Sequence, residues 1–305
     1  MKAIIWGHKP EDGHTHSYVH AAFFKAFAHL GYETLWLDNS DIVDDSSLKD
    51  SIFLTEGQVD AQIPVIKGCK YVLHNCDLKK YQDVLPNCLN LQVYTHDALK
   101  PERNVQKIKG DFIFLQPKAV VDSVQVGIDN RTLYMPWATN LLPHEFPKID
   151  VSQMRTQRTN VCNWVGSVCG GFQGNETELQ EFARACQAMN VQVQLARFPD
   201  GLPSIRAIQW SHTAPALQGQ WQVDKGYIPC RVFKNISYGR IPGTNNPTVQ
   251  TLFQGNLPYG RPGDLVKLAW DRESSVSQED LDDLMNFVRD HHTYVNRIQQ
   301  ILEVL

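Results

Sequence analysis

The chain of 305 residues has few of the features that assign a sequence to a class at first sight. No apolar run approaches the roughly 18 residues that a membrane-spanning helix needs. The opening stretch "MKAIIWGHKP" has too short an apolar core for a secretory signal. We therefore expect a cytoplasmic protein without a membrane span, whose first apolar residues form a buried strand. Peripheral contact with a membrane is left open.

Cysteine pairs and basic blocks are also missing. The seven cysteines are an odd number and include no C-x-x-C pair, which argues against a disulfide framework and against a zinc site. The net charge of -4, with no basic block interleaved with aromatic residues, argues against stable nucleic-acid binding. Any anion that this chain binds should be small and held by a few local residues.

The first half of the chain has the pattern of a mostly parallel sheet. "KAIIWG" is a short apolar run, and "SYVHAAFFKAFAHLGYETLWLD" reads as a helix that stops at Gly31 and a second strand that ends at Asp38. Further apolar runs follow at "KYVLHNC", "NLQVYTH", "DFIFLQP" and "RTLYMPWA". We predict a Rossmann-like domain over residues 1–150 and place the linker near residues 142–159.

The pattern restarts after this linker. "NVCNWVGS" reads as a strand, "NETELQEFARACQAMN" as a helix and "VQVQLAR" as a strand, so residues 151–278 are predicted to form a second Rossmann-like domain. Residues 279–305 contain apolar residues at helical spacing and predict the closing helices. The fold class is therefore α/β with two similar halves.

The segment "KGYIPCRVFKNISYGRIPGTNN" is the strongest candidate for an anion site. A helix that begins at Pro229 places Val232, Phe233 and Ile236 on an apolar face. The opposite face carries Arg231, Lys234, Asn235 and Tyr238. Two cations near a helix start, with its free amides, suit a phosphate or diphosphate. The alternative is an ordinary solvated helix face.

A small polar loop follows this helix. It contains Thr244, Asn245 and Asn246, whose side chains are suited to the hydroxyls of a ribose or sugar.

These residues resemble the carboxy-terminal half of group 1 glycosyltransferases, in the branch that includes spore-maturation-type proteins. The likeness lies in "GY", "RVF" and "YG" around Arg231, in "PYGRPGDLVKLAW", and in the closing "HHTYVNRIQQIL". The resemblance implies the GT-B fold, in which two Rossmann-like domains face a cleft. The first takes the acceptor, the second takes a nucleotide sugar, and the carboxy-terminal helices pack back toward the first.

The resemblance also implies roles for individual residues. Gly166 and Ser167 of "WVGS" would approach the donor diphosphate, which Arg231 would hold. Many relatives have a ribose-binding glutamate at the position of Lys234; a lysine cannot accept those hydrogen bonds, so Lys234 is expected to join Arg231 on phosphate. Asn235 and the Thr244–Asn246 loop would bind ribose or sugar. The base would meet Trp221, Gln222, Val223 and Asp224, with plain packing as the alternative for the tryptophan.

Histidines are dense after the first predicted strand, in "GHKPEDGHTHSYVH". Loops at the carboxyl ends of parallel strands bind ligands, and imidazole can take a proton from a hydroxyl near neutral pH. We take His16, then His14 and Asp12, as candidates for acceptor activation, and expect His20 and His29 to be helix residues with satisfied hydrogen bonds. A metal site is a weak alternative because a His-x-His pair lacks a convincing third ligand. His74, Asp77, His96 and Asp97 follow other predicted strands and are kept as substitutes.

The sequence thus predicts a glycosyltransferase that moves a sugar from a nucleotide-diphosphate donor to an acceptor hydroxyl of a glycan or other molecule. Protein cations, with no metal or other cofactor, would stabilise the leaving nucleotide. One alternative is a non-catalytic protein of the same fold that binds a nucleotide or glycan. Another is a nicotinamide-dependent oxidoreductase, which is disfavoured because "GHKPEDG" lacks the G-x-G-x-x-G spacing.

Overall fold

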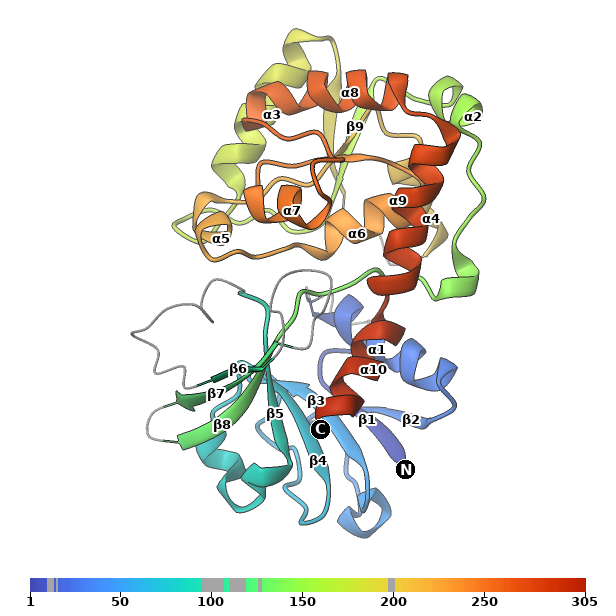
Figure 1. The fold of residues 1–305 in the computed structure, drawn as a ribbon. Helices are drawn as coiled ribbons and strands as arrows, with labels where there is room; N and C mark the ends of the chain where they lie inside the picture. The colour runs from blue at the N-terminus through green and yellow to red at the C-terminus, as the bar shows by residue number, and fades with distance from the viewer. Residues whose placement is uncertain (10–13, 15, 95–106, 110–118, 126–127, 197–200) are drawn as a thin grey trace. The chain divides into compact units, whose positions relative to one another are not determined.

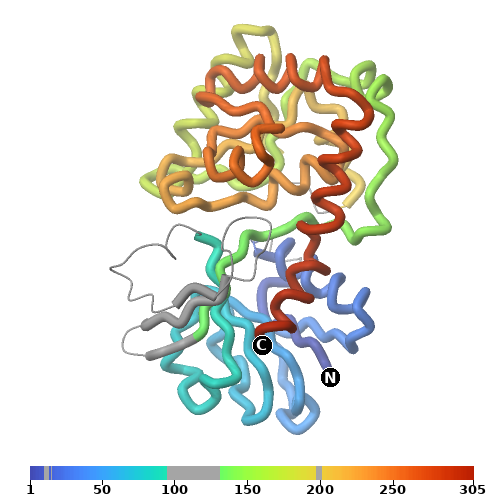
Figure 2. The backbone as a smooth tube through the Cα atoms, in the orientation of Figure 1, coloured from blue at the N-terminus to red at the C-terminus, as the bar shows by residue number. Residues whose placement is uncertain are grey.

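The computed structural model describes residues 1–9, 14, 16–94, 107–109, 119–125, 128–196 and 201–305. The chain divides into two compact units (Figures 1 and 2). Unit 1 contains Met1–Leu142 and Tyr294–Leu305, and unit 2 contains Pro143–Thr293. The predicted boundary at residue 150 therefore lies seven residues beyond the first residue of unit 2. No helix within the described ranges is long and apolar enough to cross a membrane.

Unit 1 is built on one eight-stranded sheet with the order β2-β1-β3-β4-β5-β8-β7-β6. Strands β2 to β8 along this order are parallel, whereas β7 is antiparallel to both β8 and β6. The strands are β1 (Lys2–Trp6), β2 (Glu33–Leu37), β3 (Ile52–Glu56), β4 (Lys70–His74), β5 (Cys88–Gln92), β6 (Lys107–Lys109), β7 (Ala119–Gln125) and β8 (Ile128–Tyr134).

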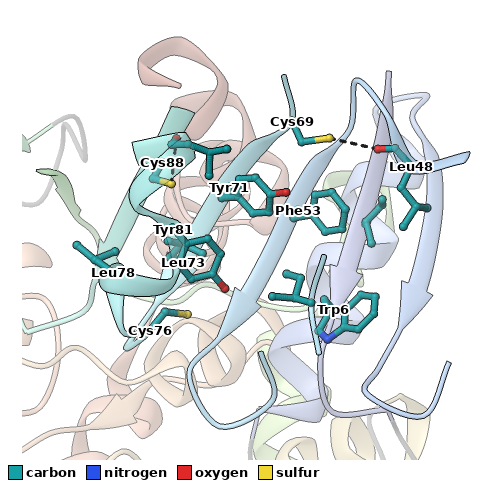
Figure 3. Packing of buried hydrophobic residues seen from close by; sticks show 13 residues of the cluster. Trp6, Leu48, Phe53, Cys69, Tyr71, Leu73, Cys76, Leu78, Tyr81 and Cys88 are labelled. Carbon is teal, nitrogen blue, oxygen red and sulfur yellow. Dashed lines mark hydrogen bonds between the residues drawn. The ribbon is translucent and has the colours of Figure 1, made fainter. Parts of the chain in front are cut away.

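Both faces of the central parallel strands are covered, which explains their continuous apolar sequences. Buried residues of different strands, such as Ile4 of β1 and Phe53 of β3, belong to one cluster. This cluster also includes Tyr71 and Tyr81 (Figure 3). Tyr81 comes from the 3-10 segment η3 (Leu78–Asn87). The buried Cys69 thiol donates to the carbonyl of Leu48 within this core.

One central strand, β3, was not predicted from the sequence pattern. β3, "IFLTE", pairs with β1 and β4 and is fully buried, but its five residues do not alternate between apolar and polar. The run "DFIFLQP" lies outside the described residues. The run "RTLY" does form part of β8, which is parallel to β5.

The opposite face of the sheet is covered by α1 (Ser17–His29) and α10 (Tyr294–Val304), which pack on each other (Figure 1). The ring of Tyr294 lies edge-on to that of Phe23, 4.7 Å between centroids. Arg297 is fully buried and donates to the carbonyls of Pro136, at 2.9 Å, and Trp137, at 3.4 Å. Burial lowers the pKa of this guanidinium to about 10. The prediction that the end of the chain packs on the first half is therefore confirmed for α10.

Unit 2 has less sheet than predicted. Within its described residues β9 (Val161–Val165) pairs with β10 (Gln192–Ala196), and the short β11 (Ala214–Pro215) pairs with β12 (Pro242–Gly243); both pairs are parallel. Helices surround these strands: α2 (Val151–Thr156), α3 (Glu176–Ala188), α4 (Leu202–Gln209), α5 (Gln220–Asp224), α6 (Cys230–Ser237), α7 (Pro247–Leu252), α8 (Leu265–Ser275) and α9 (Gln278–His291).

Two expectations for unit 2 need correction. The polar stretch placed in the linker forms α2, because Asp150 caps it by accepting the amides of Ser152 and Gln153. Helix α9, which begins with a Ser277–Asp280 capping box, belongs to unit 2. Only α10, and not the whole of residues 279–305, returns to unit 1.

We predict that Arg297→Ala destabilises unit 1, because the variant leaves two carbonyls without a charged donor and opens a cavity beside α10. The expected loss in free energy of unfolding is about 3 kcal/mol. Urea unfolding followed by circular dichroism measures it, with the exposed Gln299→Ala on the same helix as the matched control. Equal stability of the two variants would contradict this role for Arg297.

Candidate active site

The predicted anion site of unit 2 begins with Arg231 in the first turn of α6. Its guanidinium carbon lies 3.7 Å from the ring centroid of Trp164, and its Nε donates to the carbonyl of Val165 at 3.1 Å. Both partners belong to β9. The arginine is thus fixed at the carboxyl end of that strand by a cation–π contact and a hydrogen bond.

Gly166 and Ser167, which follow the end of β9, form the loop that is expected to approach a diphosphate. Gly166 has a φ of 136°, and a Cβ built there would come within 2.3 Å of Nη2 of Arg231. The carbonyl of Ser167 accepts the indole N–H of Trp164 at 3.4 Å. Gly166, Ser167 and Arg231 are therefore brought together, and only a glycine allows the guanidinium to lie so close to this backbone.

Lys234 lies one turn further along α6 and is half-buried. Residues three apart share a helix face, so Lys234 lies on the same face of α6 as Arg231. Its role toward phosphate stays a prediction.

The face of α6 that carries Arg231 and Lys234 also carries Asn235 and Tyr238. Asn235 and Tyr238 share this face by their spacing, but each is only 1% exposed, so this part of the face is buried, and ribose or sugar binding by Asn235 stays a prediction. The Asn235 amide donates to the carbonyl of Ala214 at 3.2 Å. A helical wheel could not reveal this carbonyl, because it comes from β11, far away in sequence.

The polar loop after α6 is held by its own side chains. Asn246 is buried, caps α7 by accepting the amide of Thr248 at 2.8 Å, and donates to the carbonyl of Tyr227. Asn245 exchanges hydrogen bonds with the backbone of Gln218, and the Thr244 hydroxyl, which is also buried, accepts the amide of Asn246. These contacts fix the loop, and ribose or sugar binding by it stays a prediction.

The four predicted base-binding residues, Trp221, Gln222, Val223 and Asp224, lie on α5. The Trp221 ring is half-buried and lies edge-on to the highly exposed ring of Phe172, 6.2 Å between centroids. Asp224 accepts a hydrogen bond from Gln220 at 2.7 Å. An exposed aromatic pair of this kind can stack on a flat ligand.

Unit 1 contains a second group of polar side chains, at the carboxyl ends of its parallel strands. Five rings, which we call the imidazole cluster, surround the end of β3: His8, His14, His16, His20 and His74. The carboxylate of Glu56, the last residue of β3, faces two of them. Its Oε1 lies 3.1 Å from Nε2 of His8 and 3.6 Å from Nδ1 of His16.

The charges in this cluster follow from burial and from these contacts. Burial raises the pKa of Glu56, but the His16 and His8 rings outweigh it and hold the value at about 2. Burial lowers the pKa of His20 to about 3 and that of His74 to about 4. Glu56 is therefore an anion near neutral pH, whereas His20 and His74 are neutral.

Four of these side chains, those of His16, His20, Glu56 and His74, line a small hollow that opens to solvent. It is bounded by one aromatic wall from Trp137 and Phe23 and by the polar groups of the strand ends. The full lining is His16, Val19, His20, Phe23, Leu54, Thr55, Glu56, His74, Leu91 and Trp137.

The remaining candidates of the first half fall into three groups. His74 is held at both nitrogens, since Nδ1 donates to the carbonyl of Leu91 and Nε2 accepts from Asn75, each at 3.0 Å. Asp77 is exposed and caps η3 through the amide of Lys79. Three more, Asp12, His96 and Asp97, lie outside the described residues.

Three side chains at this edge are close enough together to be tested as a metal site. His8, His14 and Glu56 could each offer one ligand atom, all within 4.8 Å of one another. However, Nδ1 of His14 accepts the amide of His16 at 3.2 Å, which leaves the proton on Nε2. The His8 and His14 rings are also stacked, 3.7 Å between centroids, so their lone pairs do not converge on one point. As hydrogen-bonded, the trio does not fit a metal.

The sequence also contains one Asp-x-Asp triplet, Asp280–Leu281–Asp282, which the pattern analysis overlooked. Asp280 closes the capping box of α9, and Asp282 accepts a hydrogen bond from Gln278 at 3.0 Å. Both aspartates therefore stabilise a helix start, and the triplet gives no reason to add a metal.

The sequence analysis missed two members of the hollow, Glu56 and Trp137. The run "IFLTEG", an apolar segment that ends in an acid and a glycine, would have revealed Glu56 as a strand-end residue. Nothing local marks Trp137, whose position depends on the buried Arg297 of α10.

No protein-family model matches the chain, and no curated protein matches it. Solved structures do. The glycosyltransferase AviGT4, involved in avilamycin A biosynthesis, is 11% identical, with a TM-score of 0.56 over 99% of this chain and 96% of its own. An α-glucosyltransferase in complex with UDP and a 13-mer DNA containing a HMU base is 9% identical, with a TM-score of 0.57 over 100% of this chain and 99% of its own.

The chain therefore has the GT-B glycosyltransferase fold. Identities of 9% and 11% show the fold alone, and the match spans both units. The predicted fold class, α/β with two Rossmann-like halves, is confirmed.

We predict that Gly166→Ala weakens binding of a nucleoside diphosphate about tenfold or more, because its Cβ displaces the Arg231 guanidinium and removes a charge-assisted contact. Isothermal titration with UDP measures this. Gly171→Ala is the matched control, since Gly171 also has a positive φ, 76°, but no atom within 4 Å of the built Cβ. Equal affinities in both variants would argue against this position for the diphosphate.

A second prediction concerns Glu56 and pH. Its folded pKa, about 2, is below the reference value of 4.5, so its contribution to stability is present above the reference value and is lost as the pH falls toward 2. This contribution is at most roughly 3 kcal/mol. The free energy of unfolding of the parent should exceed that of Glu56→Gln at pH 6, and the difference should shrink as the pH falls from about 4.5 toward 2. A difference that does not change with pH would contradict the pairing.

Proposed function

We propose that this protein is a glycosyltransferase that moves a sugar from a nucleotide-diphosphate donor to an acceptor hydroxyl. The observation that carries the proposal is the Arg231 guanidinium, held against Gly166 at the carboxyl end of β9. In open α/β sheets this is the edge where ligands bind. The fold shared with known glycosyltransferases supports it.

The chemistry needs a fixed positive charge. The bond from the anomeric carbon to the diphosphate oxygen breaks, and negative charge develops on that oxygen. Arg231 provides a planar fork for phosphate oxygens, Lys234 a second positive charge, and the start of α6 free backbone amides. These groups can stabilise the leaving nucleotide without a metal or another cofactor.

The acceptor oxygen forms the new bond to the anomeric carbon, and its proton must go to a base or to the leaving phosphate. His16 is the proposed group that receives the proton of this hydroxyl or orients it, and His14 and Asp12 are the alternatives. In this proposal the acceptor hydroxyl approaches His16 from the small hollow that His16 lines together with Trp137.

The donor and acceptor are proposed in general terms. UDP, which one structural neighbour binds, is a reasonable first donor nucleotide, with the base near Trp221 and the ribose near the Thr244–Asn246 loop. A glycan or another hydroxyl-bearing molecule is proposed as acceptor in glycan biosynthesis in the cytoplasm. DNA, which the same neighbour binds, is not, because this chain has a net charge of -4. The kinship with spore-maturation-type proteins belongs to this proposal as well.

We predict that Arg231→Ala lowers donor use by about two to three orders of magnitude, because one charge-assisted contact to the leaving phosphate is lost. A thermal-shift panel of UDP-, GDP-, ADP- and dTDP-linked sugars identifies the donor. Release of the free nucleotide then measures turnover. Arg206→Ala, an exposed arginine of α4, is the control. A fully active Arg231→Ala protein would remove the basis of the donor site.

A further inference from the structure

Glu56 is an unusual residue for the end of a central strand. Its side chain is 3% exposed, and within the described part of the chain two imidazoles lie within ion-pair distance of it. They come from different segments, His8 after β1 and His16 at the start of α1. Buried carboxylates are retained only where a cation or several hydrogen-bond donors compensate them. The buried carboxylate of Glu56 therefore needs N–H groups that donate hydrogen bonds to it.

His16 has a nitrogen that suits this need. Its Nδ1 is buried and has no hydrogen-bond partner among the described residues, and it lies 3.6 Å from Oε1 of Glu56. This distance is slightly longer than a hydrogen bond, as is common before a substrate tightens a site. A neutral imidazole has one donor and one acceptor nitrogen. If Nδ1–H faces the carboxylate, Nε2 carries the lone pair.

We propose that Glu56 is a positioning residue: it holds the His16 ring with Nδ1–H toward its carboxylate, so that Nε2 accepts a hydrogen bond from a substrate hydroxyl. This rests on the proposed function. When the hydroxyl oxygen bonds to the anomeric carbon, its O–H bond breaks and the proton passes to Nε2. The imidazolium that forms lies beside the carboxylate of Glu56, which stabilises it.

The other described rings of the cluster are less suited to this role. His74 uses both nitrogens within the fold, and Nδ1 of His14 accepts the amide of His16. His20 is 2% exposed and lies against Gly7. His8 makes the shorter contact to the same oxygen of Glu56, Oε1, and so anchors the carboxylate. His16 also lines the hollow, edge-on to His74 and to Trp137.

The first test detects the tautomer directly and needs no activity. In ¹⁵N-histidine NMR spectra of the full chain, the resonance that disappears in His16→Gln should report Nδ1–H in the parent. It should move toward the Nε2–H tautomer in Glu56→Ala. Glu33→Gln, an exposed acid of β2, should leave it unchanged. An Nε2–H signal for His16 in the parent would overturn the proposal.

The second test is kinetic, with the full chain and the donor identified by thermal shift. Glu56→Ala should lower kcat about 10- to 100-fold with the donor KM within twofold, since the residue acts through His16. Glu56→Gln, which keeps an acceptor oxygen, should recover part of the loss. The double variant Glu56→Ala/His16→Ala should be no slower than His16→Ala alone.

The two proposals fail differently. If Glu56→Ala keeps kcat within twofold, or its effect multiplies with that of His16→Ala, the positioning role is wrong, although Arg231→Ala can still support the transferase. If the parent transfers no sugar from any nucleotide donor, the proposed function fails. The NMR result then decides the tautomer alone.

Discussion

The carboxyl ends of parallel strands are the constraint on which both candidate sites depend. In such a sheet the strands run in one direction, so the residues that follow them collect at one edge. In unit 1 this edge gathers His8 after β1, Glu56 at the end of β3 and His74 at the end of β4. In unit 2 the same rule places Gly166 after β9, where Arg231 meets it. Neither group is contiguous in the sequence.

Electrostatic compensation explains why each group stays in place without a ligand. Arg231 rests on the Trp164 ring and donates to the carbonyl of Val165, neither of which carries a full negative charge. The carboxylate of Glu56, in contrast, is almost enclosed, and imidazole N–H groups compensate its negative charge. Removing a partner from the enclosed anion costs more than removing one from the partly exposed cation.

The sequence predicts those parts that depend on local pattern. Helix α1, the strand before it, the segment around Arg231 and the histidine-rich loop were recognised from apolar spacing, glycine stops and clustered polar residues. Gly166 was singled out only by the resemblance to glycosyltransferases. What failed was long-range. β3 was missed because a short buried strand shows no alternation, and Glu56 was lost with it. The burial of Asn235 was not foreseen, since its partner, a carbonyl of Ala214, belongs to a distant strand.

The two sites have opposite electrostatic characters, and the proposed reaction needs both. Departure of a diphosphate builds negative charge, which a fixed guanidinium stabilises without reorganisation. Attack by a hydroxyl releases a proton, and an imidazole backed by a carboxylate can hold it as an ion pair. If the residues of the two sites were exchanged, both steps would be disfavoured. An anion beside the diphosphate would repel it, and a guanidinium cannot accept a proton from the hydroxyl. Within a glycosyltransferase, this pairing of charge with step is the physical reason to read Arg231 as donor-binding and His16 with Glu56 as hydroxyl-binding.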